Sequence, residues 1–482
     1  MPRLTALLWF RQDLRLADHP ALLAAVEQGP TACLYVLDDD GPGEWAIGGA
    51  QRWWLHYSLA SLATSLEAIG GKLILRRGPA AATVAAVAAE IGATSIHATR
   101  HYEPWWRAAD AELGNRLILH DGDTLVPPEQ VQTGAGTPFK VYGPFYRALT
   151  EHLPPPHPEP APKRIVAPST GAKSDTLDDW HLLPTDPDWA TGFGDWEPGE
   201  DGAHARLADF ADEVADYATR RDRPSQEGTS RLSPHLHHGE ISPRTVWHAF
   251  HGPEAGKFLK ELAWRDFARS ALLGQPHLPS KATRPEPRWR VGKAAEDDFT
   301  AWTRGRTGYP IVDAGMRQLS ATGWMHNRVR MIAASFVVKH LLVDWRRGAG
   351  WYWDTLVDAD LGNNSLNWQW IAGTGSDSSP FARIMAPLSQ SAKFDAADYI
   401  RQWVPELASL SEPDIHDPVF RPANYPPMLI GHRQGRERAL SALAAGRDDK
   451  DVALAAGRDD KDVTLAAGRD DKDVALANAR TG

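Results

Sequence analysis

The chain has 482 residues, of which 42 % are hydrophobic and 24 % are charged, and its formal net charge at pH 7 is −10. A chain of this length exceeds one ordinary hydrophobic core, so two globular domains are expected. The single cysteine, Cys33, excludes a disulfide framework, and no apolar run reaches the length that crosses a bilayer, so we expect a cytoplasmic protein without a membrane segment.

Residues 1–130 alternate between short apolar, β-branched runs and segments with helical periodicity. This alternation, with glycines at the helix ends, predicts an α/β domain whose doubly wound parallel sheet has five strands and helices on both faces. No G-x-G-x-x-G follows the first strand and no G-x-x-x-x-G-K-[ST] occurs, so neither common nucleotide-binding loop is indicated. The expected strands lie within 5–10, 32–38, 72–78, 93–100 and 116–122.

The pattern changes after residue 130. Residues 131–202 are rich in proline and turn residues, as in "HLPPPHPEPAPKR", which predicts a long connection over the surface. Residues 203–440 have a helical pattern almost throughout, which predicts an all-α second domain. Residues 441–482 hold three copies of an 11-residue unit, and we expect this tail to be disordered or marginally helical.

Charge is distributed unevenly along the chain. Residues 217–347 contain 22 Lys and Arg against 12 Asp and Glu, although the whole chain is acidic. Two interpretations fit this local excess: a phosphate-binding face, or a helical surface whose charges point into solvent in all directions. Charge alone does not decide between them.

Three stretches of the helical region combine aromatic and hydrogen-bonding residues. "GTSRLSP" (228–234) places glycine and hydroxyl side chains at a helix start, which suits a phosphate but is also routine capping. "ELAWRDF" (261–267) presents an acid, an indole and a guanidinium on one helical face. "DADLGNNSLNWQW" (358–370) gathers carboxylates, amides and indoles within three or four turns. "HLHH" (235–238) has no carboxylate or cysteine at ligand spacing, so no metal site is expected there.

These stretches, in this order, closely resemble the motifs of the photolyase/cryptochrome flavoproteins. The similarity runs from "LLWFRQDLRLADHPAL" through "RTGYPIVDAGMRQL" and "GWMHNRVRM" to "QSAKFD", and it leaves out the proline-rich connection and the tail. Among the members of this family, the sequence is most similar to class I cyclobutane pyrimidine dimer photolyases. The resemblance implies an α/β domain, an all-α FAD-binding domain and light-driven DNA repair.

The resemblance also implies which residues hold FAD. The phosphates and ribityl chain would lie near "GTSRLSP", and the isoalloxazine ring near Asp358, Asp360 and Asn364. The working form, FADH⁻, is an anion, so an uncharged amide at Asn364 avoids the repulsion that a carboxylate beside N5 would cause. The residues expected to bind the cofactor are Tyr217, Thr229, Ser230, Arg231, Leu232, Ser233, Phe258, Glu261, Arg265, Arg330, Asp358, Ala359, Asp360 and Asn364.

Three tryptophans match the family's electron relay to the flavin: Trp368, Trp345 and Trp289. Trp368 and Trp345 align with the motif without gaps, whereas Trp289 lies in a segment with a small apparent insertion. A relay role and a packing role are compatible, because a relay needs only rings at close spacing.

Other matching positions would line a pocket for a cyclobutane dimer flipped out of DNA. Trp264 and Trp370 would form its walls, and Glu261 would act in catalysis by bonding a pyrimidine edge. The 6-4 photolyases carry histidines where this chain has Asn327 and Met331, so the cyclobutane lesion is expected. The residues expected at the DNA and the lesion are Arg221, Glu261, Trp264, Asn327, Arg328, Met331, Trp370 and Gln390.

Two questions stay open at this level. Family members that bind a folate antenna often carry an Asn-Glu pair after "YE", where this chain has Trp105 and Trp106. A second chromophore is expected, but folate (MTHF), a deazaflavin and no antenna all stay open. The alternative function is a cryptochrome-type photoreceptor without repair activity, in which the tail or a partner would read out the flavin state. Asn364 and the lesion residues favour the enzyme, a carbon–carbon lyase acting as a monomer on damaged DNA without an obligate protein partner.

Overall fold

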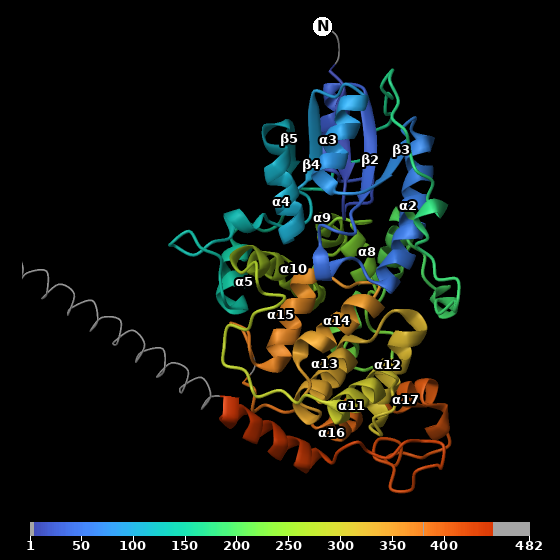
Figure 1. Ribbon diagram of the computed structural model, residues 1–482, viewed down its shortest axis with the longest axis vertical. Coiled ribbons are helices and arrows are strands. Elements are labelled where there is room, and N and C mark those ends of the chain that lie inside the picture. Colours follow the sequence, from blue (N-terminus) through green and yellow to red (C-terminus); the bar gives the residue numbers. More distant parts are fainter. Residues whose placement is uncertain (1–3, 379, 447–482) are drawn as a thin grey trace, which may run out of the picture.

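The computed structural model describes residues 4–378 and 380–446. Figure 1 shows an α/β layer at one end of the molecule and a larger body of helices at the other. The 11-residue repeats fall almost entirely outside the described residues, so the expectation for the tail stays a prediction.

The α/β region contains the expected sheet of five parallel strands, in the order β3-β2-β1-β4-β5. Leu8 of β1 is aligned with Cys33 of β2 on one side and with His97 of β4 on the other, so β1 is the central strand. Every residue of β1 and β2 is buried, which explains why these strands are continuous apolar runs rather than alternating ones. The strands are β1 (Ala6–Phe10), β2 (Thr31–Leu37), β3 (Leu73–Arg77), β4 (Ser95–Thr99) and β5 (Leu117–His120).

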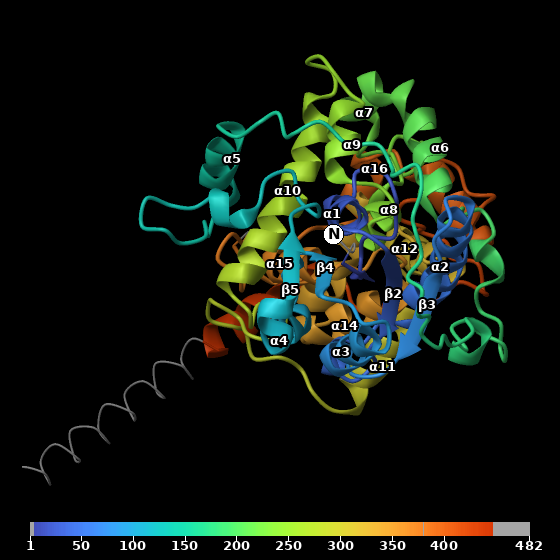
Figure 2. The ribbon, with the colours of Figure 1, turned by 90° about the horizontal axis from the view of Figure 1, so that it is seen from above.

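Helices cover both faces of the sheet, and Figure 2 shows this arrangement from above. Leu8 belongs to the apolar cluster formed with α1 and α2, whereas its neighbours Leu7 and Trp9 belong to the cluster formed with α3 and α4. Adjacent strand residues point to opposite faces, so both helix layers are anchored by the same strand. The doubly wound fold is therefore confirmed. These helices are α1 (Pro20–Gln28), α2 (Gly49–Ala68), α3 (Ala80–Glu90) and α4 (Pro104–Leu113).

The proline-rich connection follows the α/β region closely. The N–H of Ile165 donates to the carbonyl of Ile69 over 2.8 Å, and the N–H of Thr31 donates to the carbonyl of Val166, also over 2.8 Å. The connection also contains a helix that was not predicted, α5 (Tyr142–Thr150), which begins around a Gly-Pro pair and buries Phe145 and Leu149.

The rest of the described chain is helical, and no β-strand follows β5 within it. Glycines in the left-handed conformation end three of its helices, at Gly239 (φ 69°), Gly323 (φ 67°) and Gly373 (φ 74°). Residues 432–446 are also helical. The named helices are α6 (Glu200–Ala211), α7 (Tyr217–Arg220), α8 (Ser233–His238), α9 (Pro243–His248), α10 (Gly256–Gly274), α11 (Lys293–Thr303), α12 (Pro310–Thr322), α13 (Asn327–Ser335), a π-helical turn (Phe336–His340), α14 (Trp345–Thr355), α15 (Leu361–Ala372), α16 (Pro387–Lys393) and α17 (Ala397–Trp403).

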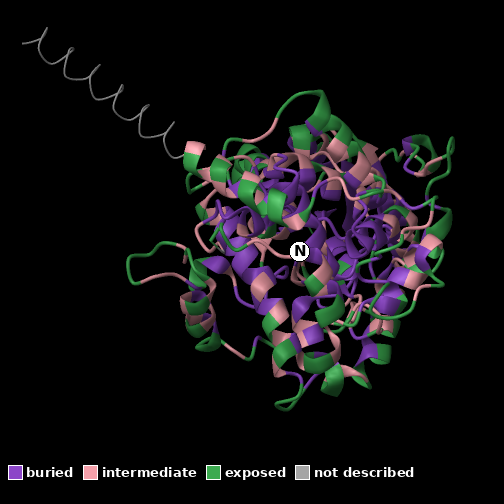
Figure 3. Cartoon of the chain, turned by 90° about the horizontal axis from the view of Figure 1, so that it is seen from below, coloured by how far each residue is buried: buried purple, intermediate pink, exposed green. Residues whose placement is uncertain are grey.

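Helix α15 lies at the centre of the helical region, packed between α10 and α14. A Cβ added to Gly348 of α14 would lie 2.2 Å from the Trp368 ring, so the two helices approach this closely only because residue 348 has no side chain. Buried residues are concentrated inside this body of helices in Figure 3, with exposed residues at its rim. None of the described helices combines the length and apolar character that a membrane crossing requires.

Buried polar contacts join the α/β region to the helices. The side-chain amide of Gln51 on α2 donates to the carbonyl of Trp353 on α14 over 3.0 Å. The indole N–H of Trp54 donates to the carboxylate of Glu240 over 2.9 Å. The two regions are thus in direct contact beside the candidate site.

Candidate active site

Three segments that are distant in sequence meet at the carboxylate of Asp358, just before α15. Arg330 of α13 donates two parallel hydrogen bonds to it, over 3.0 and 2.9 Å, and the hydroxyl of Ser233 on α8 donates a third over 2.6 Å. The Arg330 Nε also donates to the carbonyl of Met325 over 2.7 Å, which fixes the guanidinium plane. The predicted pairing of Arg330 with Asp358 is present, and the negative charge of Asp358 is compensated.

Asp360 is the N-cap of α15. One of its oxygens accepts from the backbone N–H of Asn363 over 2.7 Å and from the side-chain amide of the same residue over 2.9 Å. The other oxygen pairs with Arg269 of α10. Burial opposes ionisation here, but Arg269 and His237 outweigh it and hold the pKa of Asp360 well below its usual value. Asp360 is therefore a carboxylate at neutral pH.

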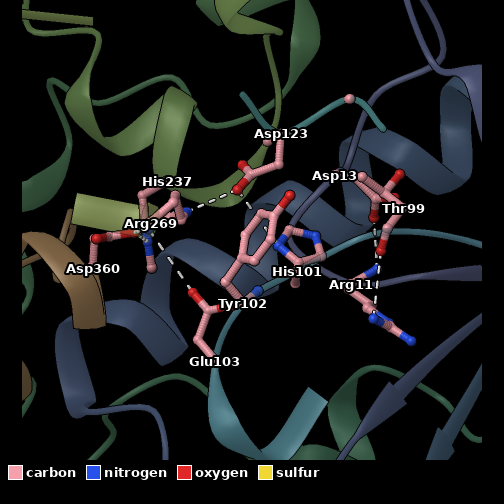
Figure 4. A network of polar contacts seen from close by, with 12 residues as sticks. Arg11, Asp13, Thr99, His101, Tyr102, Glu103, Asp123, His237, Arg269 and Asp360 are labelled. Atoms are coloured by element: carbon pink, nitrogen blue, oxygen red, sulfur yellow. Dashed lines mark hydrogen bonds and ion pairs between the residues drawn. The ribbon is translucent and has the colours of Figure 1, made fainter. Parts of the chain in front are cut away.

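Arg269 is the centre of a buried charge network, which Figure 4 shows from close by. Its Nε donates to Asp123 over 2.8 Å, and its Nη1 lies 3.9 Å from Glu103, both acids of the α/β region. Asp123 also pairs with Arg265, and despite burial these two arginines lower the pKa of Asp123 to about 2. Arg269 was not among the predicted site residues, although it lies one helical turn after Arg265 on the same face.

Asn364 lies on the first turn of α15 and is half-buried. Its side-chain N–H donates to the carbonyl of Ala349 on α14 over 3.1 Å. No described donor is bonded to its side-chain oxygen. The amide is therefore oriented by the neighbouring helix, with an acceptor atom left for a ligand.

The loop before α8 contains the predicted phosphate-binding residues. Arg231 has a positive φ of 50°, so the chain turns sharply between Ser230 and the start of the helix. The N–H of Leu232 donates to the Ser230 hydroxyl over 3.3 Å, and the Arg231 guanidinium lies 5.3 Å from the ring centre of Trp324. The hydroxyl of Thr229 makes no hydrogen bond to the described residues. This loop keeps polar groups of 229–231 in a partly exposed position.

Other predicted cofactor residues have structural partners. Tyr217 and Phe258 are buried in one aromatic cluster, with ring centres 5.3 Å apart. Arg265 donates to Asp123 and to the carbonyl of Leu236, so both of its terminal nitrogens have partners within the protein. Ala359 is buried between the two aspartates. Their contacts with a cofactor remain predictions.

The three tryptophans of the expected relay lie along α15, at the start of α14 and in the segment before α11. Trp368 is 3 % exposed and Trp345 is fully buried, whereas Trp289 is half-buried. The indole N–H groups of Trp345 and Trp289 donate to the same oxygen of Glu286, over 3.1 and 3.3 Å. The structure thus brings Trp289 to Trp345 through a shared acceptor that the sequence did not indicate.

The predicted lesion residues fall into small groups. Arg221 and Glu261, both predicted to contact the DNA or the lesion, form an ion pair with each other. Arg328 pairs with Asp222 over 2.8 Å and lies 3.8 Å from the sulfur of Met331. These ion pairs neutralise part of the positive charge of residues 217–347, so this segment does not present a continuous cationic surface.

Trp264 has an unexpected neighbour. The ring of Tyr142, at the start of α5, is stacked on it with centres 3.5 Å apart and an angle of 6° between the planes. One face of Trp264 is thereby covered. Asn327 is exposed, and Trp370 and Gln390 are half-buried without a side-chain contact to the other predicted lesion residues.

The remaining motifs have packing roles in this structure. His235 pairs with Glu240, and the ring of His238 is stacked on Trp54. Within the described ranges, no group of three or more His, Cys, Asp or Glu is arranged to hold a metal ion. Trp106 is buried against Trp9, and the guanidinium of Arg11 lies over both rings.

Comparison with known proteins agrees with this geometry. Residues 258–445 match the FAD binding domain of DNA photolyase, and residues 6–163 match the DNA photolyase family. The chain belongs to the photolyase/cryptochrome family. A deoxyribodipyrimidine photo-lyase of Agrobacterium fabrum is 46 % identical, over 91 % of this chain and 97 % of the relative. Cryptochrome-1 of Arabidopsis thaliana is 35 % identical, over 91 % of this chain and 70 % of the relative.

Among solved structures, a bacterial class III photolyase from Agrobacterium tumefaciens is similar with a TM-score of 0.87 and 45 % identity, over 93 % of this chain and 98 % of that chain. Family membership is thus confirmed, but the class I assignment is not.

FAD suits the arrangement of charges in this member of the family. The two carboxylates before α15 are each paired with an arginine, and the amide of Asn364 adds no charge. The Nη2 of Arg269 is buried without a hydrogen-bond partner among the described residues, so a donor is available near Asp360. The site can therefore accept an anionic ring with polar edges.

Proposed function

We propose that this protein repairs cyclobutane pyrimidine dimers in DNA with light, by electron transfer from FADH⁻ to a lesion flipped out of the duplex. The observation that carries the proposal is the neutral amide of Asn364, placed after two carboxylates that arginines already compensate. An anionic reduced flavin would meet an acceptor and no net negative charge there.

FAD, when bound, supplies the light-excited electron donor. The chain would bind its phosphates and ribityl group with the hydroxyls and backbone of residues 229–233 and orient the ring with Asp358, Asp360 and Asn364. The free side-chain oxygen of Asn364 would accept a hydrogen bond from the N5–H group and favour the reduced form. No nucleophile or metal from the chain is required for this reaction.

The lesion would be held by residues of α10, α13, α15 and α16. Photolyases act on target nucleotides flipped out of the duplex, and damaged nucleotides are easier to unstack and unpair. Glu261 would exchange its bond with Arg221 for a bond to the pyrimidine edge, and Arg221 would then be free to contact the DNA backbone. Asn327 and Met331, in place of the histidines of 6-4 photolyases, support the cyclobutane lesion.

Purified, chemically reduced protein tests the proposal with an oligonucleotide that contains one thymine dimer. We expect dimer loss in blue light and none in the dark. Glu261→Gln should lower repair without loss of bound flavin, whereas Glu254→Gln, an exposed residue just before α10, should not change it. A protein that binds and photoreduces flavin but leaves dimers intact would instead be a photoreceptor, like the cryptochromes it also resembles.

We also propose a second, antenna chromophore, a folate or a deazaflavin, and a monomeric protein without an obligate protein partner. Because Trp105 and Trp106 replace the polar pair of folate-binding members, the antenna would lie elsewhere or bind differently. Chromophore extraction with an absorption spectrum identifies it, and light scattering in solution measures the mass. The domain division at residues 130, 202 and 440 and the cytoplasmic location likewise stay predictions.

A further inference from the structure

Glu286 lies in the segment between α10 and α11 and contacts two tryptophans of the proposed relay. Its Oε1 accepts from the indole N–H of Trp345 over 3.1 Å and from that of Trp289 over 3.3 Å. Trp345 is 59 residues away in sequence, so the fold, and not local geometry, creates this shared acceptor. One carboxylate thus touches both outer indoles.

Arg346 holds this carboxylate in place. Its two terminal nitrogens donate to the two oxygens of Glu286, each over 3.0 Å, and its Nε donates to the carbonyl of Ser280 over 2.7 Å. Burial opposes the charge, but Arg346 and the two indoles outweigh it and lower the pKa of Glu286. The acid is therefore ionised at neutral pH and is a weak base.

Arg346 is shared between two acids. Arg346 also pairs with Asp344, over 3.0 Å, so one guanidinium compensates two carboxylates. Glu286 therefore shares its arginine with a second acid. Within the described part of the chain, no carboxylate accepts from the indole of Trp368, the relay residue on α15.

We propose that Glu286 is a positioning residue that draws the electron vacancy of the relay outward, from Trp368 to Trp345 and Trp289. The proposal rests on the proposed function, in which these three tryptophans pass an electron to oxidised FAD. In this step one electron leaves an outer indole and fills the vacancy on Trp368. No bond breaks, and the proton stays on the indole nitrogen, hydrogen-bonded to Glu286. An anionic acceptor stabilises the indole cation more than the neutral indole, so it favours the outward position.

The chain offers a matched control for this role. Arg347, the residue after Arg346, donates to both oxygens of Glu296 over 2.6 Å, and its guanidinium lies 4.2 Å from the ring centre of Phe299. This arrangement repeats an acid, an arginine and an aromatic ring, but without an indole N–H on the acid. Glu296→Gln thus removes a similar ion pair without touching the relay.

The first experiment is transient absorption of the FAD-loaded protein after a blue flash, which follows tryptophan radicals directly. In Glu286→Gln we expect the long-lived radical population on the outer tryptophans to fall about tenfold, because a neutral amide cannot compensate an indole cation. Glu296→Gln should match the wild type, and Glu286→Asp should recover part of the yield. An unchanged yield in Glu286→Gln, or an equal loss in both Gln variants, would overturn the proposal.

The second experiment removes the flavin and uses a flash-generated ruthenium(III) tris-bipyridine oxidant on the apoprotein. The part of the oxidation that disappears in Trp289→Phe reports on this indole alone. If Glu286 stabilises the indole cation, Glu286→Gln should slow that part by a similar factor, whether or not FAD receives the electron. If the wild type does not photoreduce flavin but Glu286→Gln still slows oxidation of Trp289 in the apoprotein, the relay is refuted and the role of Glu286 is not. If Glu286→Gln leaves the oxidation of Trp289 unchanged, the role of Glu286 is refuted.

Discussion

Single residues set the charge of the candidate site through partners that come from other segments. Asn364 is the clearest case, since its side-chain N–H is bound to α14 and its side-chain oxygen can accept a hydrogen bond from a flavin nitrogen. Replacement of this amide by a carboxylate changes the charge and leaves the shape almost unchanged. The effect of the charge can therefore be measured separately.

Asn364→Asp should hinder full reduction of the flavin. A negative charge beside an anionic ring disfavours the reduced form, and we expect its share at a fixed reducing potential to fall about tenfold or more. Absorption spectra during photoreduction measure this share. Asn367→Asp is the control, because Asn367 is exposed on the same helix and bonds only to the carbonyl of Asn363. Unchanged accumulation of FADH⁻ in Asn364→Asp would contradict the role of the amide.

Trp345→Phe tests the relay at the same scale. Phenylalanine fills most of the space but is much harder to oxidise, so photoreduction should slow by roughly tenfold or more. Trp351→Phe, on the same helix α14 but outside the proposed path, should leave the rate unchanged. Equal rates for wild type and Trp345→Phe would remove Trp345 from the relay.

At the scale of elements, α10 is the helix that ties the α/β region to α15. Its residues Arg265 and Arg269 bind Asp123, and its Asp266 accepts backbone N–H groups of Leu125 and Val126, over 3.0 and 3.2 Å. These contacts fix the segment after β5 against the flavin side of the molecule. Because α10 buries both basic and acidic side chains, the free energy of unfolding is expected to depend on pH.

Asp266→Asn should remove one such dependence. Burial raises the pKa of Asp266 from 3.8 to about 7, so the folded state holds its proton more tightly than the unfolded state. The stabilisation is complete below pH 3.8 and is lost as pH rises to about 7, by up to about 4 kcal/mol. Urea unfolding between pH 4.5 and 7.5 should show this decline in the wild type and a smaller one in Asp266→Asn. The same dependence of the free energy of unfolding on pH in both proteins would contradict this role of Asp266. Asp212→Asn, at an exposed site, is the control.

The elements were more predictable from sequence than their contacts. Four of the five strands fall inside the expected ranges and β2 begins one residue before its range, at Thr31, because central strands are long apolar runs with glycine-bounded helices between them. Helix α5 was missed because its Gly143 and Pro144 resemble a turn. Glu286 lies three residues before Trp289, but its link to Trp345 depends on tertiary packing. Periodicity reports burial, whereas a contact across 59 residues leaves no local pattern.

For the whole molecule, the buried network of Figure 4 joins the two regions through charged side chains whose separation costs considerable free energy. Asp360 belongs to the flavin side, Asp123 and Glu103 belong to the α/β side, and the fully buried Arg269 lies between them. Removal of one partner from such a cluster typically costs about 3–5 kcal/mol. We therefore expect the two regions to unfold together rather than one at a time.

Cys33 reports on this coupling because it is the sole cysteine of the chain and is fully buried in β2. Burial raises the pKa of its thiol to about 12, so a thiol reagent should react only after the sheet opens. If the regions open together, FAD bound to the helices should protect Cys33, by about a hundredfold when free FAD is a hundred times its dissociation constant. Labelling rates of the apoprotein with and without FAD measure this protection.

Arg269→Met should weaken the protection of Cys33 by FAD, because the network between the regions is then broken. Arg401→Met, in an exposed pair with Asp398, should not weaken it. Labelling of Cys33 at the same rate with and without bound FAD would show that the sheet opens independently of the helices.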